Sequence, residues 1–310
     1  MLMRAINVVL LPVVITFAFS PITPVRAESD VPMEVKLVDA MEHLSSGPYK
    51  GFRAVHAKGL VAQAEFIASE EAKSITKASF LQPGIHTPVI VRFSNNSGIP
   101  NLSDSDPDSS PRGLAIRFDL GDDGNVDLVM VTAKHFPVAT PEEFLQLMNA
   151  VVQSKPASSH PSPIEKFLGE HPAAMDFVVN SNANAKSFAN LQFNGINSFR
   201  MVNSENNSVF IRYKLLPEDG LNNLTDPELA QRTTNYLYDE LAKRLESLKI
   251  QYNLYAVVAE DTDNVVDSSK AWPSSRKTVL LGRLTVSGLH PNGSTLSSTI
   301  MFNKNFSLSE

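Results

Sequence analysis

Three short runs of sequence decide the fold: residues 88–94 (PVIVRFS), 113–119 (GLAIRFD) and 126–132 (VDLVMVT). All three are rich in β-branched and aromatic residues, which fit the pleated surface of a strand. Turn-forming residues separate them, notably Asn95-Asn96-Ser97-Gly98 after the first run, so the runs have the spacing of hairpins. Together with residues 60–68, which alternate loosely, they predict neighbouring strands of one antiparallel sheet.

Further strands are expected later in the chain. Residues 196–203 and 208–215 flank Glu205-Asn206-Asn207, which is a hairpin signal, and residues 252–260 and 278–287 supply the last two. Eight strands are enough to close a barrel that leaves no free edge. The sequence therefore predicts an α+β fold, an antiparallel eight-stranded β-barrel with flanking helices.

Helices are expected before, between and after these strands. Apolar residues recur every three positions from Val35 to Leu44, which predicts an amphipathic helix within residues 28–46. Thr140-Pro141-Glu142-Glu143 combines a capping box with proline at the first helical position, which predicts a helix to about residue 152. The remaining predictions are an irregular stretch at residues 154–172 and helices near residues 173–180 and along residues 226–248.

Composition limits the classes of function. The 310 residues suit one large domain or two small ones, and a hydrophobic content of 43% is ordinary for a globular protein with a real core. A formal net charge of −6 argues against a general nucleic-acid binder. The chain has no cysteine, which excludes disulfides, zinc–thiolate sites and thiol catalysis.

The N-terminus has the pattern of a signal peptide. Arg4 precedes an apolar stretch, residues 5–19, that is short for a membrane span, and a cleavage position with small residues ends at Ala27. We expect residues 1–27 to be removed. Residues 28–310 would then form one exported domain, periplasmic or secreted and free of the membrane. A buried N-terminal helix is the alternative.

Several segments resemble known sequences residue by residue, beyond their patterns of strands and helices. In order and spacing, the first of them resemble haem catalases: residues 53–59 (RAVHAKG), 87–94 (TPVIVRFS), and 111–118 (PRGLAIRF) with 124–129 (GNVDLV). Later ones resemble the smaller bacterial catalase-related peroxidases: residues 136–144 (FPVATPEEF), 193–199 (FNGINSF), and 271–273 (AWP) with 279–282 (VLLG). The resemblance runs from about residue 40 to the end of the chain.

The resemblance implies a peroxidase with a catalase-like barrel. Its substrates would be hydrogen peroxide or organic peroxides together with a small electron donor, and its cofactor would be haem b. The distal histidine by resemblance is His56, which moves a proton from one peroxide oxygen to the other. Histidine suits this step because both of its protonation states are accessible near neutral pH. Ser94 matches the serine that hydrogen-bonds this histidine. The alternatives are a packed structural histidine and an ordinary strand-end serine.

The same resemblance supplies residues that would hold the cofactor. Arg53 and Arg92 match arginines that pair with haem propionates, a role that suits the planar donor fork of the guanidinium group. Their alternative is a surface or interstrand ion pair. Residues that would wall the distal pocket, and that core packing explains equally well, are Val55, Phe136 and Phe144. The other histidines have no metal-ligand spacing and are interpreted as surface or loop residues: His43, His86, His135, His160, His171 and His290.

Two positions depart from the pattern of that family. An ungapped alignment puts Val131 where large catalases have a distal asparagine, and valine cannot donate a hydrogen bond to peroxide. This lowers the expected rate of dismutation and leaves peroxidase activity open. The proximal iron ligand implied by the resemblance is a tyrosine in an Arg-x-x-x-Tyr motif, and the chain reaches Glu310 before that position. Arg232 and Tyr236 have the motif's form, but they lie on the helix expected at residues 226–248, where helix packing explains them.

Three hypotheses of function remain open. The first is the haem-dependent peroxidase. The second is a haem-free binding or remnant protein that keeps the barrel, which the missing tyrosine and Val131 favour. The third, minor hypothesis is rearrangement of a fatty hydroperoxide, which an apolar pocket permits.

Overall fold

The computed structural model describes residues 31–154, 160–181 and 184–303. The predicted signal peptide, residues 1–27, lies outside the described residues, as does the end of the chain after Asn303. Met33–Glu310 forms one compact unit. Within the described part, no helix is long and apolar enough to cross a membrane.

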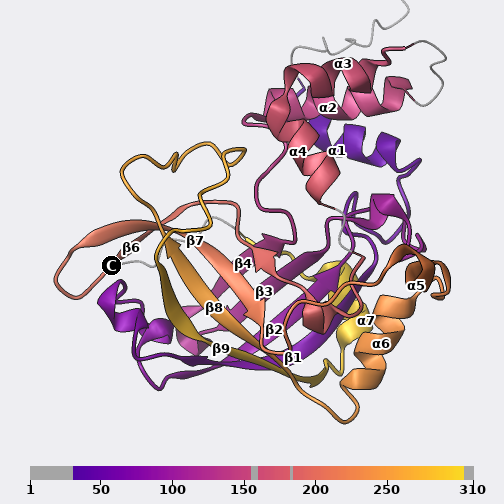
Figure 1. Cartoon of the computed structure of the whole chain (residues 1–310). Coiled ribbons are helices and arrows are strands. Elements are labelled where there is room, and N and C mark those ends of the chain that lie inside the picture. Colours follow the sequence, from indigo (N-terminus) through magenta and orange to yellow (C-terminus); the bar gives the residue numbers. More distant parts are fainter. Residues whose placement is uncertain (1–30, 155–159, 182–183, 304–310) are drawn as a thin grey trace, which may run out of the picture. The chain divides into compact units, whose positions relative to one another are not determined.

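A ring of eight strands closes into a barrel (Figure 1). Its order is β4, β3, β2, β1, β9, β8, β7 and β5, and β5 pairs with the strands on both sides of it. β6 lies outside the ring, beside β7. The bounds are β1 (Gly59–Ala68), β2 (His86–Ser94), β3 (Gly113–Asp119), β4 (Asn125–Val131), β5 (Phe193–Asn194), β6 (Phe199–Val202), β7 (Ser208–Pro217), β8 (Ile250–Val258) and β9 (Thr278–Leu289). The predicted antiparallel eight-stranded barrel is confirmed. The strand expected at residues 196–203 corresponds to β6 alone. The strand that closes the ring, β5, lies just before that range and was not predicted.

Alternation along the strands separates an inner face of the barrel from an outer one. Phe93 of β2 opposes Leu114 of β3, and both side chains are buried in the barrel interior. The next pair, Ser94 and Gly113, belongs to the outer face, and Val131 of β4 stands on the other side of Gly113. A row of residues without long side chains, Ser94, Gly113 and Val131, therefore crosses the outside of these three strands.

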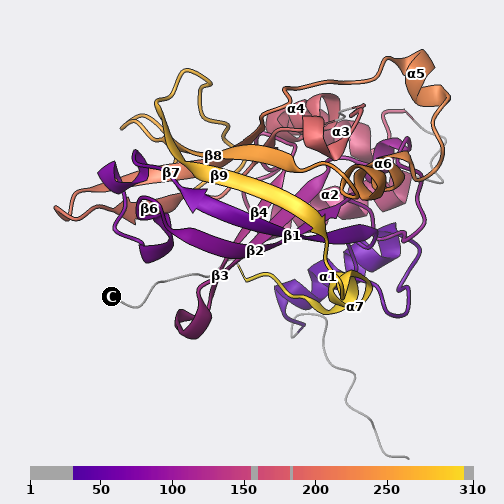
Figure 2. The ribbon, with the colours of Figure 1, turned by 90° about the horizontal axis from the view of Figure 1, so that it is seen from below.

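The helices form two groups. Figure 1 shows α1–α4 gathered together, with α5 and α6 beside the barrel, and α7 packs on β1 (Figure 2). The bounds are α1 (Met33–Leu44), α2 (Pro141–Ser154), α3 (Pro163–Glu170), α4 (Pro172–Asn180), α5 (Asp226–Ala230), α6 (Tyr236–Arg244) and α7 (Gly293–Thr299). A second, smaller hydrophobic cluster lies among α2–α4 and consists of Val138, Ala150, Phe167 and Ala174.

Residues 154–172 are not irregular throughout, because they contain α3. The hydroxyl of Ser162 accepts the N–H of Glu165, and the Glu165 carboxylate accepts the N–H of Ser162 at 2.6 Å. Pro163 occupies the first turn of the helix. The prediction for this stretch was wrong because the sequence Ser-Pro-Ile-Glu is itself a capping box with proline at the first helical position.

The single long helix predicted for residues 226–248 is also wrong, since α5 and α6 are separate helices. A distant residue, Asp104, explains the break. Its backbone N–H donates to the carbonyl of Thr234 at 2.8 Å, and its carboxylate accepts the N–H of Leu237 at 2.9 Å. The carboxylate thus caps the start of α6, where the helix dipole favours negative charge.

Candidate active site

His56 lies in the loop that precedes β1, and its backbone has a conformation that L-residues rarely adopt. Its φ is 54°, in the left-handed region, where a residue other than glycine costs about 1–3 kcal/mol. Two hydrogen bonds hold it there. Its N–H donates to the carbonyl of Asn96 at 3.2 Å, and its own carbonyl accepts from Arg92 Nη2 at 2.8 Å. The backbone of His56 is therefore fixed from two sides.

The imidazole of His56 is directed at the outer face of β2 and β3. Its Nδ1 is 3.0 Å from the hydroxyl oxygen of Ser94. Gly113 lies against this pair, and a Cβ there would be 2.6 Å from Ser94 Oγ and 2.9 Å from His56 Nδ1. Only glycine leaves room for the histidine and the serine to meet. The sequence-based prediction did not single out Gly113, although a glycine inside a strand signals a close approach.

The guanidinium groups of Arg53 and Arg92 lie near each other beside His56. Arg92 is 3% exposed and donates through Nε to the carbonyl of Ser297 at 3.1 Å. Burial, and then the charge of Arg53, lowers the pKa of Arg92 to about 10. Burial also lowers the pKa of Arg53, whose Nη2 donates to the carbonyl of Ile300. The buried Nε of Arg53 has no hydrogen-bond partner among the described residues. Two neighbouring cations with N–H donors still available form a site that suits an anion.

The other residues predicted for the site are connected differently. Val55 is half-buried and directly precedes His56. Phe136 and Phe144 contact each other, with ring centroids 4.9 Å apart, and pack against the hydrophobic cluster of α2–α4. The contacts that join His56 to Ser94 and Arg92 do not include these three apolar residues.

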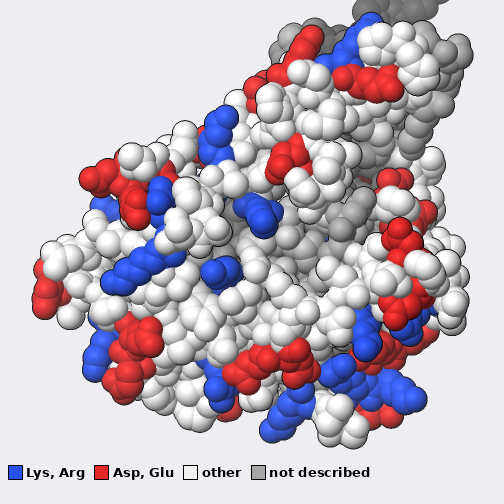
Figure 3. Space-filling view, viewed as in Figure 1, with Lys and Arg blue, Asp and Glu red and all other residues white. Residues whose placement is uncertain are grey.

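Charged side chains are mixed on the face of the molecule seen in Figure 3. Lysines and arginines alternate there with aspartates and glutamates. Such a surface agrees with the formal net charge of −6, and this face has no extended basic patch of the kind that binds nucleic acid.

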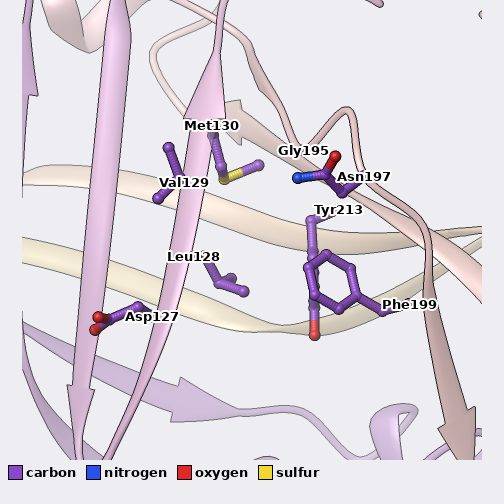
Figure 4. A pocket seen from close by; sticks show the side chains of 8 residues that line it. All are labelled: Asp127, Leu128, Val129, Met130, Gly195, Asn197, Phe199 and Tyr213. Atoms are coloured by element: carbon purple, nitrogen blue, oxygen red, sulfur yellow. The ribbon is translucent and has the colours of Figure 1, made fainter. Parts of the chain in front are cut away.

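A small cavity lies where β4 and the segment after β5 separate (Figure 4). Its volume is about 10 Å³, roughly the space for one water molecule. Phe199 and Tyr213 face one another across from β4, whereas the side chain of Asp127 is directed away, toward the neighbouring strand. This cavity is too small for a substrate, and Asp127 has its partners elsewhere.

The family model of the catalases matches residues 33–292. The chain belongs to the catalase family. The resemblance found in the sequence is thereby confirmed, and the closed barrel agrees with it. Catalase-related peroxidases of Mycolicibacterium paratuberculosis and Synechococcus elongatus are 31% and 29% identical over 247 and 245 residues. These alignments cover 79% and 78% of this chain and 77% and 71% of the two relatives.

Solved catalases have the same fold as this catalase-family chain. A bacterial catalase superposes with a TM-score of 0.70 at 22% identity, over 93% of this chain and 57% of its own. A fungal catalase superposes with a TM-score of 0.70 at 20% identity, over 86% of this chain and 56% of its own. The chain thus spans a little over half the length of these solved catalases.

Val131 occupies a distinctive position in this catalase-family chain. It opposes Gly113 on one side and Asn194 on the other, so it shares the outer face with the His56 pair. The nearest strand partner with an amide is Asn194. That amide donates to the carbonyls of Thr132 and Ala133, each at 3.2 Å, and is therefore committed to closing the barrel.

One of the remaining histidines is more buried than most loop residues. His135, interpreted as a surface or loop residue, lies in the loop between β4 and α2 and is 5% exposed. Its Nδ1 is 2.9 Å from the carbonyl of Phe136, and its Nε2 is 2.7 Å from the Asp176 carboxylate of α4. The hydrogen bond from His135 lowers the pKa of Asp176. Nothing local in the sequence signals this burial, because α4 covers the histidine from 41 residues away. Within the described part, no group of three or more residues is arranged to hold a metal ion.

Tyr236, which has the form of the family's iron ligand, is committed to packing. Its hydroxyl donates to the carbonyl of Ala185 at 2.9 Å, and burial raises its pKa. The hydroxyls of Tyr238 and Tyr252 likewise donate to backbone carbonyls, and burial raises their pKa values as well. These three phenols therefore stay protonated, which agrees with the packing interpretation of Tyr236.

Proposed function

We propose that this catalase-family chain is a haem-dependent peroxidase that breaks down hydrogen peroxide or organic peroxides through His56. The observation that carries the proposal is the His56 pair itself. Hydrogen bonds to Arg92 and Asn96 hold the backbone of His56 in an unfavourable left-handed conformation. Its imidazole contacts the Ser94 hydroxyl at a place where only the glycine at position 113 leaves room. Such strain is maintained where function requires it. The catalase-related peroxidases among the relatives support the same reaction class.

The proton steps belong to His56. When Nδ1–H donates to Ser94 Oγ, 3.0 Å away, Nε2 keeps its lone pair. Nε2 takes the proton of the nearer peroxide oxygen and returns it to the other oxygen, which leaves as water or an alcohol. Ser94 acts through the histidine, because its hydroxyl fixes the tautomer and the ring orientation. A small electron donor completes the peroxidase cycle.

Haem b fits the residues beside His56. Arg53 and Arg92 are adjacent cations that form no ion pair with any described carboxylate, and Arg53 Nε is buried without a partner. The two carboxylates of haem would supply the negative partners that these guanidinium groups lack. Haem, when bound, supplies the redox chemistry that cleaves the O–O bond.

Val131 favours peroxidase over catalase activity. A valine offers no hydrogen bond to a second peroxide molecule, and the nearby Asn194 amide is engaged by backbone carbonyls. We therefore expect a weak dismutase that oxidises an added electron donor. Product analysis with a fatty hydroperoxide tests the minor third hypothesis, because rearrangement yields a product without consuming the donor.

The deciding experiment compares His56→Ala with His86→Ala after reconstitution with haem. His86 is exposed and pairs with Glu65, so it controls for the loss of an imidazole. We expect turnover of hydrogen peroxide to fall at least about a thousandfold in His56→Ala, with haem uptake retained and with His86→Ala unchanged. Equal turnover in both variants would contradict the assignment of His56.

A haem-free binding or remnant protein is the second candidate. The observation that favours it is that Arg53 and Arg92 already donate to the backbone carbonyls of Ile300 and Ser297. An absorption spectrum of the purified chain titrated with haem separates the candidates. A Soret band that saturates at one haem per chain supports the peroxidase, and a colourless chain supports the second candidate.

We also propose that the chain acts after export, in the periplasm or outside the cell. The motivation is the signal-like pattern of residues 1–27. N-terminal sequencing of the protein from fractionated cells tests this proposal. A mature N-terminus at Glu28 in the exported fraction supports it, whereas an intact N-terminus in the cytosol contradicts it.

A further inference from the structure

Residues 297–303 run from the C-terminal end of α7 over the outer face of the barrel, and we call them the strap. Its first half is held by the two arginines beside His56. Arg92 Nε donates to the carbonyl of Ser297 at 3.1 Å, and Arg53 Nη2 donates to the carbonyl of Ile300. The last carbonyls of a helix lack intrahelical partners and carry partial negative charge. The strap therefore offers acceptors that orient one edge of each guanidinium group.

The second half of the strap is held by an ion pair. Arg117 of β3 and Asp127 of β4 are direct cross-strand partners, joined by hydrogen bonds of 2.8 and 2.6 Å. Each also binds the strap, since Arg117 donates to the carbonyl of Met301 and Asp127 accepts the N–H of Asn303 at 2.7 Å. We call Arg117 and Asp127 the buckle. The Asp127 side chain is only 1% exposed, so its charge depends on these partners.

We propose that the buckle is a positioning device for the Arg53–Arg92 pair. By fixing the far end of the strap, it keeps the strap carbonyls against the two guanidinium groups, so that their remaining donors, Arg53 Nε among them, are set for a carboxylate ligand. The inference rests on the proposed function, in which that ligand is haem. Neither buckle residue belongs to the set predicted from the sequence.

The physical reason for such a device is the flexibility of arginine. A free guanidinium group must lose the freedom of several rotatable bonds when it binds an anion, and this loss weakens binding. Here the strap has ordered both arginines beforehand. The buckle is the part of the strap's attachment that lies away from the two arginines, so it can be altered without removing a donor from the anion site.

The test uses the full chain with Asp127→Asn and, as a milder second variant, Arg117→Lys, which keeps the charge but loses the forked contact. The control is Glu218→Gln, which breaks the exposed Arg283–Glu218 pair, 2.8 Å long, without touching the strap. The first measurement is hydrogen exchange of the strap amides without haem. We expect exchange to rise about tenfold or more in both buckle variants and to stay unchanged in the control.

The second measurement titrates each variant with hemin and with protoporphyrin IX dimethyl ester, whose carboxylates are blocked. We expect hemin to bind about tenfold more weakly to Asp127→Asn, the equivalent of one charge-assisted hydrogen bond, and the ester to bind all chains alike. Unchanged hemin affinity despite a loosened strap would overturn the proposal. Tighter hemin binding would overturn it too, since the strap would then compete with the ligand.

A chain that binds no hemin at all would refute the proposed function and leave the buckle to be judged separately. In that case the reactivity of Arg53 and Arg92 toward phenylglyoxal decides. Faster modification of both arginines in the buckle variants than in the wild type and the Glu218→Gln control supports positioning by the strap. Equal rates in all chains reject it.

Discussion

The inner and outer faces of strand β2 differ in what their side chains require. On the inner face, Phe93 is surrounded by apolar groups, with the ring of Phe188 5.1 Å away. On the outer face, Ser94 meets one nitrogen of His56, and Arg92 fixes the carbonyl of the same residue. The inner face needs volume, which several residue types supply, whereas the outer face needs particular atoms at particular places. The inner face therefore contributes mainly to stability, and the outer face contributes mainly to chemistry.

The largest effect on stability is expected for Phe93→Ala. Removing a fully buried ring from the barrel should lower the free energy of unfolding by about 3–5 kcal/mol, because the transfer energy is lost and a cavity remains. Urea unfolding measures this change. Phe93→Leu is the matched control and should cost much less. A loss below about 1 kcal/mol for the alanine variant would mean that the interior repacks freely.

Gly113→Ala should instead separate chemistry from stability. A Cβ would lie 2.6 Å from Ser94 Oγ, so the His56–Ser94 pair must move apart. We expect peroxide turnover to drop about thirtyfold, the equivalent of about 2 kcal/mol. Gly288→Ala is the control, because a Cβ there would only approach the amide of Gln63 at an ordinary 3.4 Å. Normal turnover in Gly113→Ala would show that the close packing at the pair is not needed.

Ser94→Ala should have a smaller effect. It removes the hydroxyl that orients His56, so turnover should fall about tenfold while the free energy of unfolding changes by about 1 kcal/mol. Ser94→Thr keeps a hydroxyl and should recover part of the rate. If Ser94→Ala lowered stability as much as Phe93→Ala does, the distinction between the two faces of β2 would fail.

The smallest effect is expected for the His135–Asp176 pair. The hydrogen bond from His135 lowers the pKa of the Asp176 carboxyl in the folded state. A lowered folded-state pKa adds stability above the unfolded pKa of about 3.9, and this contribution is lost as pH falls through the folded value. The Asp176 side chain is 56% exposed, so the difference between wild type and Asp176→Asn should stay below about 1 kcal/mol.

Chemical unfolding at pH 6 and at pH 3 checks this sign. The two chains should differ at the higher pH and converge at the lower one. A difference that grows on acidification would contradict the assignment of the pair.

The barrel could be predicted from the sequence because strand alternation and turn residues are local signals. The segments that resemble catalases predicted a hydrogen bond between Ser94 and His56, and in the structure the two side chains are 3.0 Å apart. Their catalytic roles stay predictions. What could not be predicted depends on distant partners. Asp104 divides the helix expected at residues 226–248, and Asp176 covers His135. The strap could not be predicted either. The arginines donate to its backbone carbonyls, and because every residue has a carbonyl, the sequence gives no sign of such a contact.

The ring of strands is completed by β5, which is only two residues long. Because so little chain is needed for closure, the part of the excursion between β4 and β5 that forms α2–α4 and packs in its own hydrophobic cluster can change with little effect on the strand pairs. Phe188, later in the same excursion, belongs to the barrel core and has to be kept. Evolution has room in α2–α4 to vary the helices while the barrel stays constant. For protein engineering, the same stretch is the natural place to graft a foreign module, and Asn194 is the residue to leave untouched.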